Sequence, residues 1–336
     1  MTSDSNSTLH PTTIMHNAYA VYPSFAMLAG MQLDVFTPLG ENPMNAEALA
    51  SSLSVQKTRL SPLLYALVAA GLLSVEAEVF SNTRETDKYL VRGRPDYIGG
   101  LSGFYNTLWQ AALHTAESIR TGKPQAKLDW MSLPEDQLVK FFNSQYPGSL
   151  RSGRQLAGKI DFSGFKRLLD AGGGTGGLSI GICEACPDLK GTVADLPAVV
   201  SISKRFLVEA GMADRITTMA VDLTNSPPRG SYDVAVLRAF VQVMSPERAG
   251  KMLKNVGQAM EPGGVIHIVG SVLDDTRLSP PAAVAFNIVF LNVYDEGQAY
   301  TEREYREWLI EAGFADIFIE HNAISDGLSI VSARKE

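Results

Sequence analysis

The fold of this chain is decided by the stretch Leu168-Leu169-Asp170-Ala171-Gly172-Gly173-Gly174-Thr175-Gly176-Gly177-Leu178. An apolar run typical of a buried strand enters a glycine cluster, and an apolar-periodic segment leaves it as a helix that reaches Ala185. Gly172, Gly174 and Gly177 have the spacing G-x-G-x-x-G, which permits a tight turn and lets a ligand approach the backbone. The stretch therefore predicts a strand, a turn and a helix that together bind a nucleotide-type ligand.

Two acids favour S-adenosyl-L-methionine over a dinucleotide on this turn. Asp170 directly precedes the glycines, where it would repel the pyrophosphate that dinucleotides place at a helix N-terminus but suits the ammonium of a methionine. Asp195 ends a second short apolar run, at a distance that fits a carboxylate binding ribose hydroxyls. A glycine turn that binds no ligand is the plain alternative.

The second half of the chain alternates apolar strands with amphipathic helices. Such alternation predicts right-handed crossovers and a parallel, doubly wound sheet, in which ligands bind at the carboxyl ends of the strands. Two final strands, at 315–322 and 327–333, lie so close in sequence that we expect an antiparallel edge hairpin. The residues expected at the ligand-binding ends of the strands are Asp170, Asp195, Asp222 and Arg238.

Composition and charge exclude several classes of protein. A net charge of −7 argues against a nucleic-acid partner, and no apolar run reaches the length of a membrane span. The first eleven residues show no signal-peptide pattern, which predicts a cytoplasmic protein. Cys183 and Cys186 form C-x-x-C inside the helix after the turn, where we expect two buried small side chains and no metal site.

The N-terminal hundred residues read as a helical module. After a loose tail at residues 1 to about 12, helical patterns begin at Thr13, at Ala46 behind an Asn45 cap, and at Thr58; a hairpin follows at 72–75 and 78–81. Helices followed by a hairpin of this kind, called a wing, also occur in DNA-binding proteins, whose reading helix presents basic and amide side chains to the DNA. The helix from Thr58 to Gly71 has a single arginine, Arg59. A buried or interface helix is therefore the better interpretation. A single long helix is expected from Leu101 to Ile119.

The motifs Leu168 to Gly176, Ala194-Asp195-Leu196-Pro197, Val221-Asp222-Leu223 and Met260 to Val265 resemble the small-molecule O-methyltransferases of the plant caffeate and bacterial polyketide-tailoring type. The resemblance implies an α/β fold, with a Rossmann-like methyltransferase sheet and an N-terminal, mainly helical winged-helix domain. It implies a dimerisation domain at 1–95, a helical linker lining the active site at 96–158 and a domain binding S-adenosyl-L-methionine at 159–336. It also implies a homodimer and a small-molecule substrate.

The resemblance assigns roles to individual residues. Asp222 would contact the adenine amine, Leu223 would pack on the ring, and the remaining cofactor contacts would come from Asp170, Gly172, Gly174, Asp195, Leu196 and Arg238. Phe142 and Tyr146 fall where the family has hydrophobic cavity residues, and either ring offers a sulfonium a cation–π contact. Plain core aromatics are an equal alternative. His267 lies among apolar strand residues, so we expect a core histidine.

The chain departs from this family at its catalytic base. Gln242 stands where the family has a histidine, and an amide cannot take a proton at neutral pH. This predicts that Gln242 and Tyr146 position the acceptor, which brings a lone pair and no proton to lose. The stretch from Tyr22 to Asp34 is similar to the bacterial S-methyltransferases of dimethylsulfoniopropionate synthesis, so the first prediction is transfer to the thioether of 4-methylthio-2-hydroxybutyrate.

That acceptor has a carboxylate and a hydroxyl that need partners. Arg151 or Arg154 would supply a cation, and Asn287 and Asn292 would supply hydrogen-bond donors. The second interpretation is C-, N- or O-methylation of an aromatic natural product, with Asp295 or Glu296 as the base. The third is a catalytically silent cofactor-binding or winged-helix regulatory protein.

Overall fold

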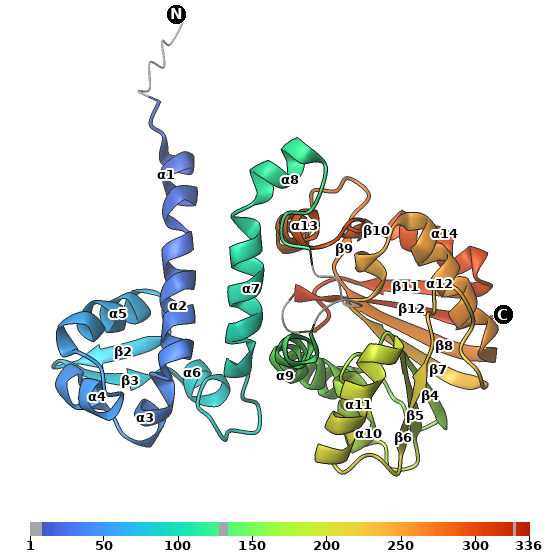
Figure 1. Ribbon diagram of the computed structural model, residues 1–336, viewed down its shortest axis with the longest axis horizontal. Helices are drawn as coiled ribbons and strands as arrows, with labels where there is room; N and C mark the ends of the chain where they lie inside the picture. Colours follow the sequence, from blue (N-terminus) through green and yellow to red (C-terminus); the bar gives the residue numbers. More distant parts are fainter. Residues whose placement is uncertain (1–8, 128–133, 325–326) are drawn as a thin grey trace, which may run out of the picture. The chain divides into compact units, whose positions relative to one another are not determined.

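The computed structural model describes residues 9–127, 134–324 and 327–336. The tail predicted at residues 1 to about 12 therefore lies largely outside the described residues. The chain divides into two compact units, Met1–Ser102 and Gly103–Glu336, and each is described by itself (Figure 1).

The first unit is a helical domain with a small sheet. Asn45 caps α4 as predicted, because its Oδ1 accepts a hydrogen bond from the backbone N–H of Ala48 at 2.9 Å. The predicted hairpin is present: β2 and β3 pair antiparallel, and β1 adds to β3. The elements of this unit are α1 (Thr12–Tyr19), α2 (Val21–Leu33), α3 (Phe36–Glu41), β1 (Met44–Asn45), α4 (Ala46–Ser52), α5 (Lys57–Ala69), β2 (Leu73–Glu76), β3 (Val79–Asn82), α6 (Arg84–Tyr89) and η1 (Gly99–Leu101).

The single helix expected from Leu101 to Ile119 is wrong, because the structure breaks it into α7 (Ser102–Ala112) and α8 (Thr115–Thr121). At the break the Thr115 hydroxyl donates to the carbonyl of Ala112 at 2.7 Å, and such local bonds compete with a continuing helix. The same hydroxyl accepts from Asn292, so the break places α8 against α13 (Pro281–Val293).

The second unit is built on a seven-stranded sheet in the order β11-β12-β8-β7-β4-β5-β6 (Figure 1). As the sequence predicts, β6, β5, β4, β7 and β8 pair in parallel, and β11 and β12 form an antiparallel hairpin. The structure adds an antiparallel pairing of β12 with β8. The strands are β4 (Arg167–Ala171), β5 (Lys190–Asp195), β6 (Ile216–Ala220), β7 (Tyr232–Arg238), β8 (Met260–Gly270), β11 (Phe314–Glu320) and β12 (Ser329–Lys335). Two short strands, β9 (Val272–Leu273) and β10 (Tyr300–Thr301), pair separately.

Helices cover both faces of this sheet, because successive strand residues point to opposite sides. Leu168 and Val236 face a cluster with α9 (Glu135–Lys159) and α10 (Gly177–Ala185), while Leu169 and Leu237 face α12 (Pro246–Gln258) and α14 (Glu302–Glu311). α11 (Pro197–Glu209) contributes Leu207 to the first cluster. Together with η2 (Val241–Val243), these elements complete the predicted α/β fold.

The predictions that His267 and Cys183 are core residues are confirmed, whereas Cys186 was also expected to be buried. His267 is buried in β8, where its Nδ1 pairs with the Ser332 hydroxyl at 2.8 Å. Cys183 is buried and Cys186 half-buried, and both are free thiols. Across the described residues, the longest apolar helix is still too short or too polar to cross a bilayer.

Candidate active site

The glycine turn lies between β4 and α10, and its backbone conformation requires glycine. Gly172 and Gly174 have φ angles of +69° and +56°, a region that side chains disfavour. The backbone N–H of Gly172 donates to the carbonyl of Ala194 at 2.8 Å, which pins the turn to the end of β5. The turn is therefore held open at the carboxyl ends of two neighbouring parallel strands, where ligands of this fold bind.

Asp195 fixes this turn through both of its carboxylate oxygens. Oδ2 accepts from the backbone N–H of Gly174 at 2.8 Å, and Oδ1 accepts from that of Leu196 at 2.7 Å. Burial raises the pKa of Asp195 to about 6, and the two backbone donors oppose that shift. A carboxylate has about four acceptor sites, so each oxygen keeps capacity for a ribose hydroxyl.

Asp170 is fully buried behind the same turn. Its Oδ2 accepts from the hydroxyl and the backbone N–H of Ser179, at 2.8 and 3.3 Å. Its Oδ1 has no hydrogen-bond partner among the described residues. Burial raises the pKa of this carboxyl to about 7, against the opposing effects of Ser179 and, more weakly, Arg238. A buried acid with an unsatisfied oxygen favours a cation on the turn.

Arg238 ends β7 on the other side of β4 from Asp195. Its Nε donates to the Ser152 hydroxyl of α9 at 2.9 Å, which ties the strand end to that helix. The side chain is half-buried and close enough to influence Asp170. A direct contact between Arg238 and the cofactor stays a prediction.

Phe142 and Phe240 cover alternate glycines of the turn from two different elements. A Cβ on Gly172 would lie 2.4 Å from the ring of Phe240, and a Cβ on Gly174 would lie 3.1 Å from the ring of Phe142. Phe142 comes from α9, as predicted. Sequence reasoning missed Phe240, which the left-handed Ala239 (φ +52°) directs towards Gly172.

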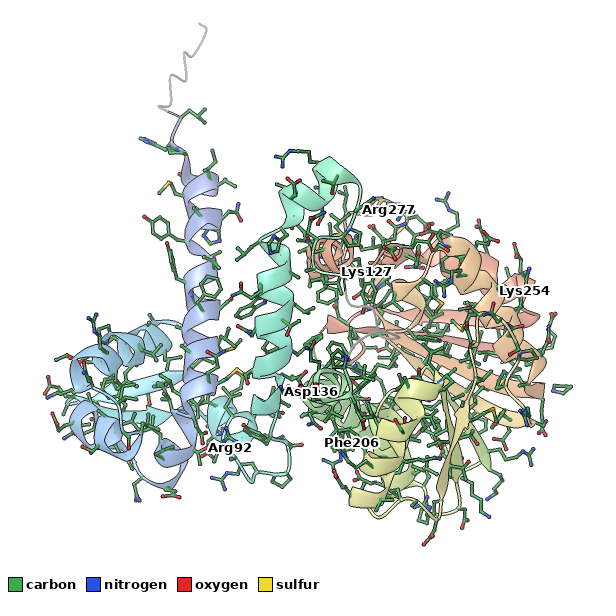
Figure 2. The ribbon with its side chains drawn as sticks, in the orientation of Figure 1. Arg92, Lys127, Asp136, Phe206, Lys254 and Arg277 are labelled. Carbon is green, nitrogen blue, oxygen red and sulfur yellow. The ribbon has the colours of Figure 1, made fainter. Side chains whose placement is uncertain are left out.

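Tyr146 packs into the helical layer. Its ring lies 4.6 Å, centroid to centroid, from that of Phe206 on α11, and burial raises its pKa. Figure 2 labels Phe206, which lies on α11 in the second unit. This contact makes Tyr146 a support for α9, and its predicted role in positioning the acceptor stays a prediction.

Gln242 is buried at the start of the segment that follows β7, 4% exposed. Its Oε1 accepts a hydrogen bond from the backbone N–H of Ser271 at 3.1 Å. Because a backbone N–H requires an acceptor, this bond fixes which end of the amide is oxygen. The side chain therefore presents N–H donors and has no base to offer.

Two of the side chains predicted to bind the substrate already form hydrogen bonds or ion pairs with other residues of the protein. Asn292 is fully buried and its amide is saturated by Thr115, Ser118 and the carbonyl of Ile288, so its role as a substrate donor is wrong. Arg154 forms a two-point pair with Glu184 at 2.6 and 3.0 Å, so it is not the expected substrate cation. Arg151 is half-buried on the same helix, and its role stays a prediction.

The proposed bases Asp295 and Glu296 are both exposed, and Asp295 pairs with Lys127 (Lys127 is labelled in Figure 2). An exposed carboxylate that a lysine already holds is poorly placed to act on a bound acceptor. Asn287 uses its Oδ1 to accept from the backbone N–H of Ala299 at 2.7 Å, which leaves its N–H groups as donors.

The two residues expected at the adenine differ in their surroundings. The Asp222 carboxylate accepts from Thr224 and Asn225, which closes a local turn after β6. Leu223 is 2% exposed and belongs to the main core, where its carbonyl accepts from Asn255. Its predicted packing on the adenine ring stays a prediction.

Together, the turn residues fit S-adenosyl-L-methionine. Any Cβ on Gly172 or Gly173 would collide with Phe240 or Asp170, so only glycine fits the turn, and the unpaired Oδ1 of Asp170 suits a ligand with a positive charge. Asp195 lies where a carboxylate would bind ribose hydroxyls.

Comparison with known proteins agrees with this geometry. The profile of the O-methyltransferase domain matches residues 135–315, and that of the O-methyltransferase dimerisation domain matches residues 15–92. The 3-hydroxy-5-methyl-1-naphthoate 3-O-methyltransferase of Streptomyces sahachiroi is 30% identical over 91% of this chain and 90% of its own. The tetracenomycin polyketide synthesis 8-O-methyl transferase of Streptomyces glaucescens is 27% identical over 91% of this chain and 92% of its own.

Human N-acetylserotonin methyltransferase, solved in complex with S-adenosylmethionine, has the same fold, with a TM-score of 0.81 at 23% identity; the match covers 98% of this chain and 99% of that chain. The two Streptomyces relatives are named for O-methyl transfer. They favour the aromatic alternative and give no support to the thioether acid. The chain belongs to the O-methyltransferase family, as a methyltransferase that uses S-adenosyl-L-methionine and carries that family's dimerisation domain.

Proposed function

We propose that this protein transfers a methyl group from S-adenosyl-L-methionine to a ring hydroxyl of an aromatic small molecule. The observation that carries the proposal is the pair of rings, Phe142 and Phe240, lying on alternate glycines of the cofactor turn. Aromatic side chains favour flat, apolar ligands through stacked and edge-to-face contacts. The relative named for a hydroxynaphthoate at 30% identity supports the same class of acceptor.

When bound, S-adenosyl-L-methionine supplies a methyl group on a positively charged sulfur. Asp195 and the glycine turn would hold its ribose, and the buried charge of Asp170 would favour its cationic end. Phe142 and Phe240 would keep water from the reacting atoms, which strengthens electrostatic contacts there. Catalysis then depends on alignment, because the Gln242 amide has no basic atom and Asp295 is paired with Lys127.

The acceptor class is tested with labelled S-adenosylmethionine and three acceptors: a hydroxynaphthoate, a naphthol and a methylthio hydroxy acid. Label is expected in the aromatic products and absent from the thioether. Transfer to the thioether alone, with both aromatic acceptors left unlabelled, would overturn the proposal. Asp195→Ala serves as the control, since it should abolish all transfer by removing cofactor binding.

We also propose that two copies of the chain associate through α1 and α2. These helices present a run of exposed large apolar side chains: Ile14, Met15, Tyr19, Val21, Tyr22, Phe25 and Leu33. Patches of this kind on a soluble protein mark interaction sites, and the dimerisation-domain match, over residues 15–92, covers all of them except Ile14. Light scattering should show a dimer that Tyr22→Glu converts to monomer, while Val208→Glu, at an exposed site on α11, leaves it intact. A monomeric wild-type protein would contradict the association.

A further inference from the structure

Gln242 and Asn287 form a matched pair of carboxamides at one place in the fold. Gln242 Oε1 accepts from the backbone N–H of Ser271, and Asn287 Oδ1 accepts from that of Ala299. Each of these backbone donors immediately precedes a short strand, Ser271 before β9 and Ala299 before β10.

The two strands bring the two amides together. β9 and β10 pair in parallel, with Val272 opposite Tyr300, so Ser271 and Ala299 fall at neighbouring positions about 5 Å apart. The backbone of Gln242 also closes on the segment before β10, because a Cβ on Gly297 would lie 2.5 Å from the carbonyl oxygen of Gln242. Both side chains therefore reach the same strand pair, one from η2 and one from α13.

The surroundings of the pair are apolar. Ala283 and Phe290 lie four residues before and three after Asn287, on the same face of α13. Both are buried in a cluster with Leu273 and Ala299, and Val243, the neighbour of Gln242, packs against that cluster. Hydrogen bonds offered in such surroundings are stronger than in water.

The locked oxygens determine what the pair can bind. With each oxygen turned to a backbone N–H, each –NH₂ group is left to donate, and the structure shows no partner for either among the described residues. Two amide donors held at the same strand pair match a ligand that carries two acceptor oxygens.

The ionisable side chains on the elements around the pair are bound to other partners, buried or exposed. Glu304 accepts from Thr301, and Asp295 pairs with Lys127. Burial raises the pKa of Tyr294 to about 12 and raises those of Tyr300 and Tyr305 still further. Of the remaining acids on these elements, the half-buried Asp274 accepts from Thr276 and the half-buried Glu302 accepts from His321. The others are exposed: Asp275, Glu296, Glu307 and Glu311.

Resting on the proposed function, we propose that Gln242 and Asn287 bind an acceptor whose hydroxyl is already ionised at neutral pH because it is conjugated with a ring carbonyl. The class is that of hydroxyquinones and other vinylogous acids. One carboxamide donates to the carbonyl oxygen, and the pair orients the anion towards the cofactor. An ordinary phenol with a pKa of about 10 is ionised to about one part in a thousand at pH 7, so it reacts poorly here.

The transfer balances without a protein base. The acceptor loses its proton to solvent before binding. Its oxygen then gives an electron pair to the methyl carbon, the carbon–sulfur bond breaks, and the pair of electrons goes to sulfur. The negative charge of the acceptor and the positive charge of the sulfonium cancel, giving a neutral methyl ether and S-adenosylhomocysteine.

The test compares a hydroxynaphthoquinone with the matching naphthol. With S-adenosylmethionine kept saturating at every pH, the wild-type enzyme should give a kcat/KM for the quinone that is nearly flat from about pH 6 to 9, and at least about 100-fold higher at pH 7 than that for the naphthol. The naphthol rate should rise about tenfold for each pH unit as more anion forms. Equal rates for the two acceptors at pH 7 would overturn the inference and leave the proposed function standing.

Variants test the two amides directly. Gln242→Met and Asn287→Leu keep the shape and remove the donors, so each should lower kcat/KM for the quinone about 10- to 100-fold. Cofactor affinity and melting temperature serve as checks on folding, and Gln258→Met, at an exposed position on α12, is the matched control. Unchanged rates in both folded variants would overturn the assignment.

If those two variants fold poorly, a third variant that should gain activity still tests the inference. Gln242→His places a base beside the acceptor, so it should raise the naphthol rate at pH 7 at least about tenfold and leave less difference between the two acceptors. A folded His variant that discriminates as strongly as the wild type would contradict the inference. Failure of every aromatic acceptor, with transfer to a thioether, would instead refute the proposed function itself.

Discussion

The carboxylate of Asp195 holds the backbone of Gly174: its Oδ2 accepts the hydrogen bond of that residue's N–H at 2.8 Å. The end of β5 thus supports the turn that carries the cofactor, and one side chain serves both the protein backbone and the ligand. Cofactor binding and the local geometry of the turn are coupled through this acid.

Asp195→Asn should weaken binding of S-adenosyl-L-methionine by about 10- to 100-fold. An amide can accept from one backbone N–H, but its own –NH₂ then faces the second donor, and the charged acceptor for the ribose is lost. Isothermal titration calorimetry measures the change. Asp188→Asn, whose side chain is 87% exposed, is the control; equal affinities for both variants would contradict this role.

Cofactor affinity should depend on pH through Asp170. Burial raises the pKa of its carboxyl to about 7, so the free protein is partly protonated at neutral pH. A cationic ligand favours the carboxylate, so binding releases a proton near pH 7 and weakens up to about tenfold per pH unit below it. Calorimetry in two buffers with different ionisation enthalpies detects this release.

Asp170→Asn is the control for that experiment. It should remove the proton release and, because a buried charge is gone, raise the melting temperature of the free protein at pH 8. The sign follows from the raised pKa: Asp170 favours the folded state below its unfolded value of 3.8, and this contribution is lost as the pH rises through 7. Proton uptake on binding would contradict the interpretation.

His267 should destabilise the protein in mild acid. Burial lowers its pKa from 6.5 to about 4. Between these two pH values the imidazole is protonated in the unfolded chain and neutral in the folded chain. Its contribution to stability is complete above pH 6.5 and is lost as the pH falls towards 4, by about 2 kcal/mol at pH 5. Urea unfolding of the wild type and His267→Gln at pH 5 and pH 8 measures this. Identical pH dependence in the two proteins would refute it.

The contact between α9 and α10 should tolerate no side chain at Gly153. A Cβ there would lie 2.3 Å from the carbonyl oxygen of Leu178, whereas Gly158 on the same helix has nothing within 4 Å. Gly153→Ala should cost about 1–3 kcal/mol of unfolding free energy. Gly158→Ala should add about 0.5–1 kcal/mol, because alanine is the better helix former. Denaturant titration measures both unfolding free energies. Similar changes for the two variants would contradict the close packing of α9 against α10 at Gly153.

Much of the site could be predicted because its residues lie at the ends of parallel strands. Strand periodicity places Asp170, Asp195 and Arg238 at one edge of the sheet, and that edge is where the structure has them. The resemblance to the family, and no local pattern, assigned the place of its catalytic histidine to Gln242.

The errors concern partners that are distant in the chain. Asn292 meets Ser118, 174 positions away, and Arg154 meets Glu184 on the neighbouring helix. No local pattern shows that these side chains are already occupied. Phe240 was missed because its direction depends on a left-handed alanine, Ala239, a conformation that alanine seldom adopts.

The most direct test of this account is the identity of the atom that receives the methyl group. The purified enzyme is incubated with S-adenosylmethionine labelled with carbon-13 in the methyl group, together with a hydroxynaphthoquinone and a methylthio hydroxy acid, and the products are examined by NMR. The account predicts a labelled methoxy carbon on the ring and no other labelled product. A labelled methyl on sulfur, or on a ring carbon, would contradict it.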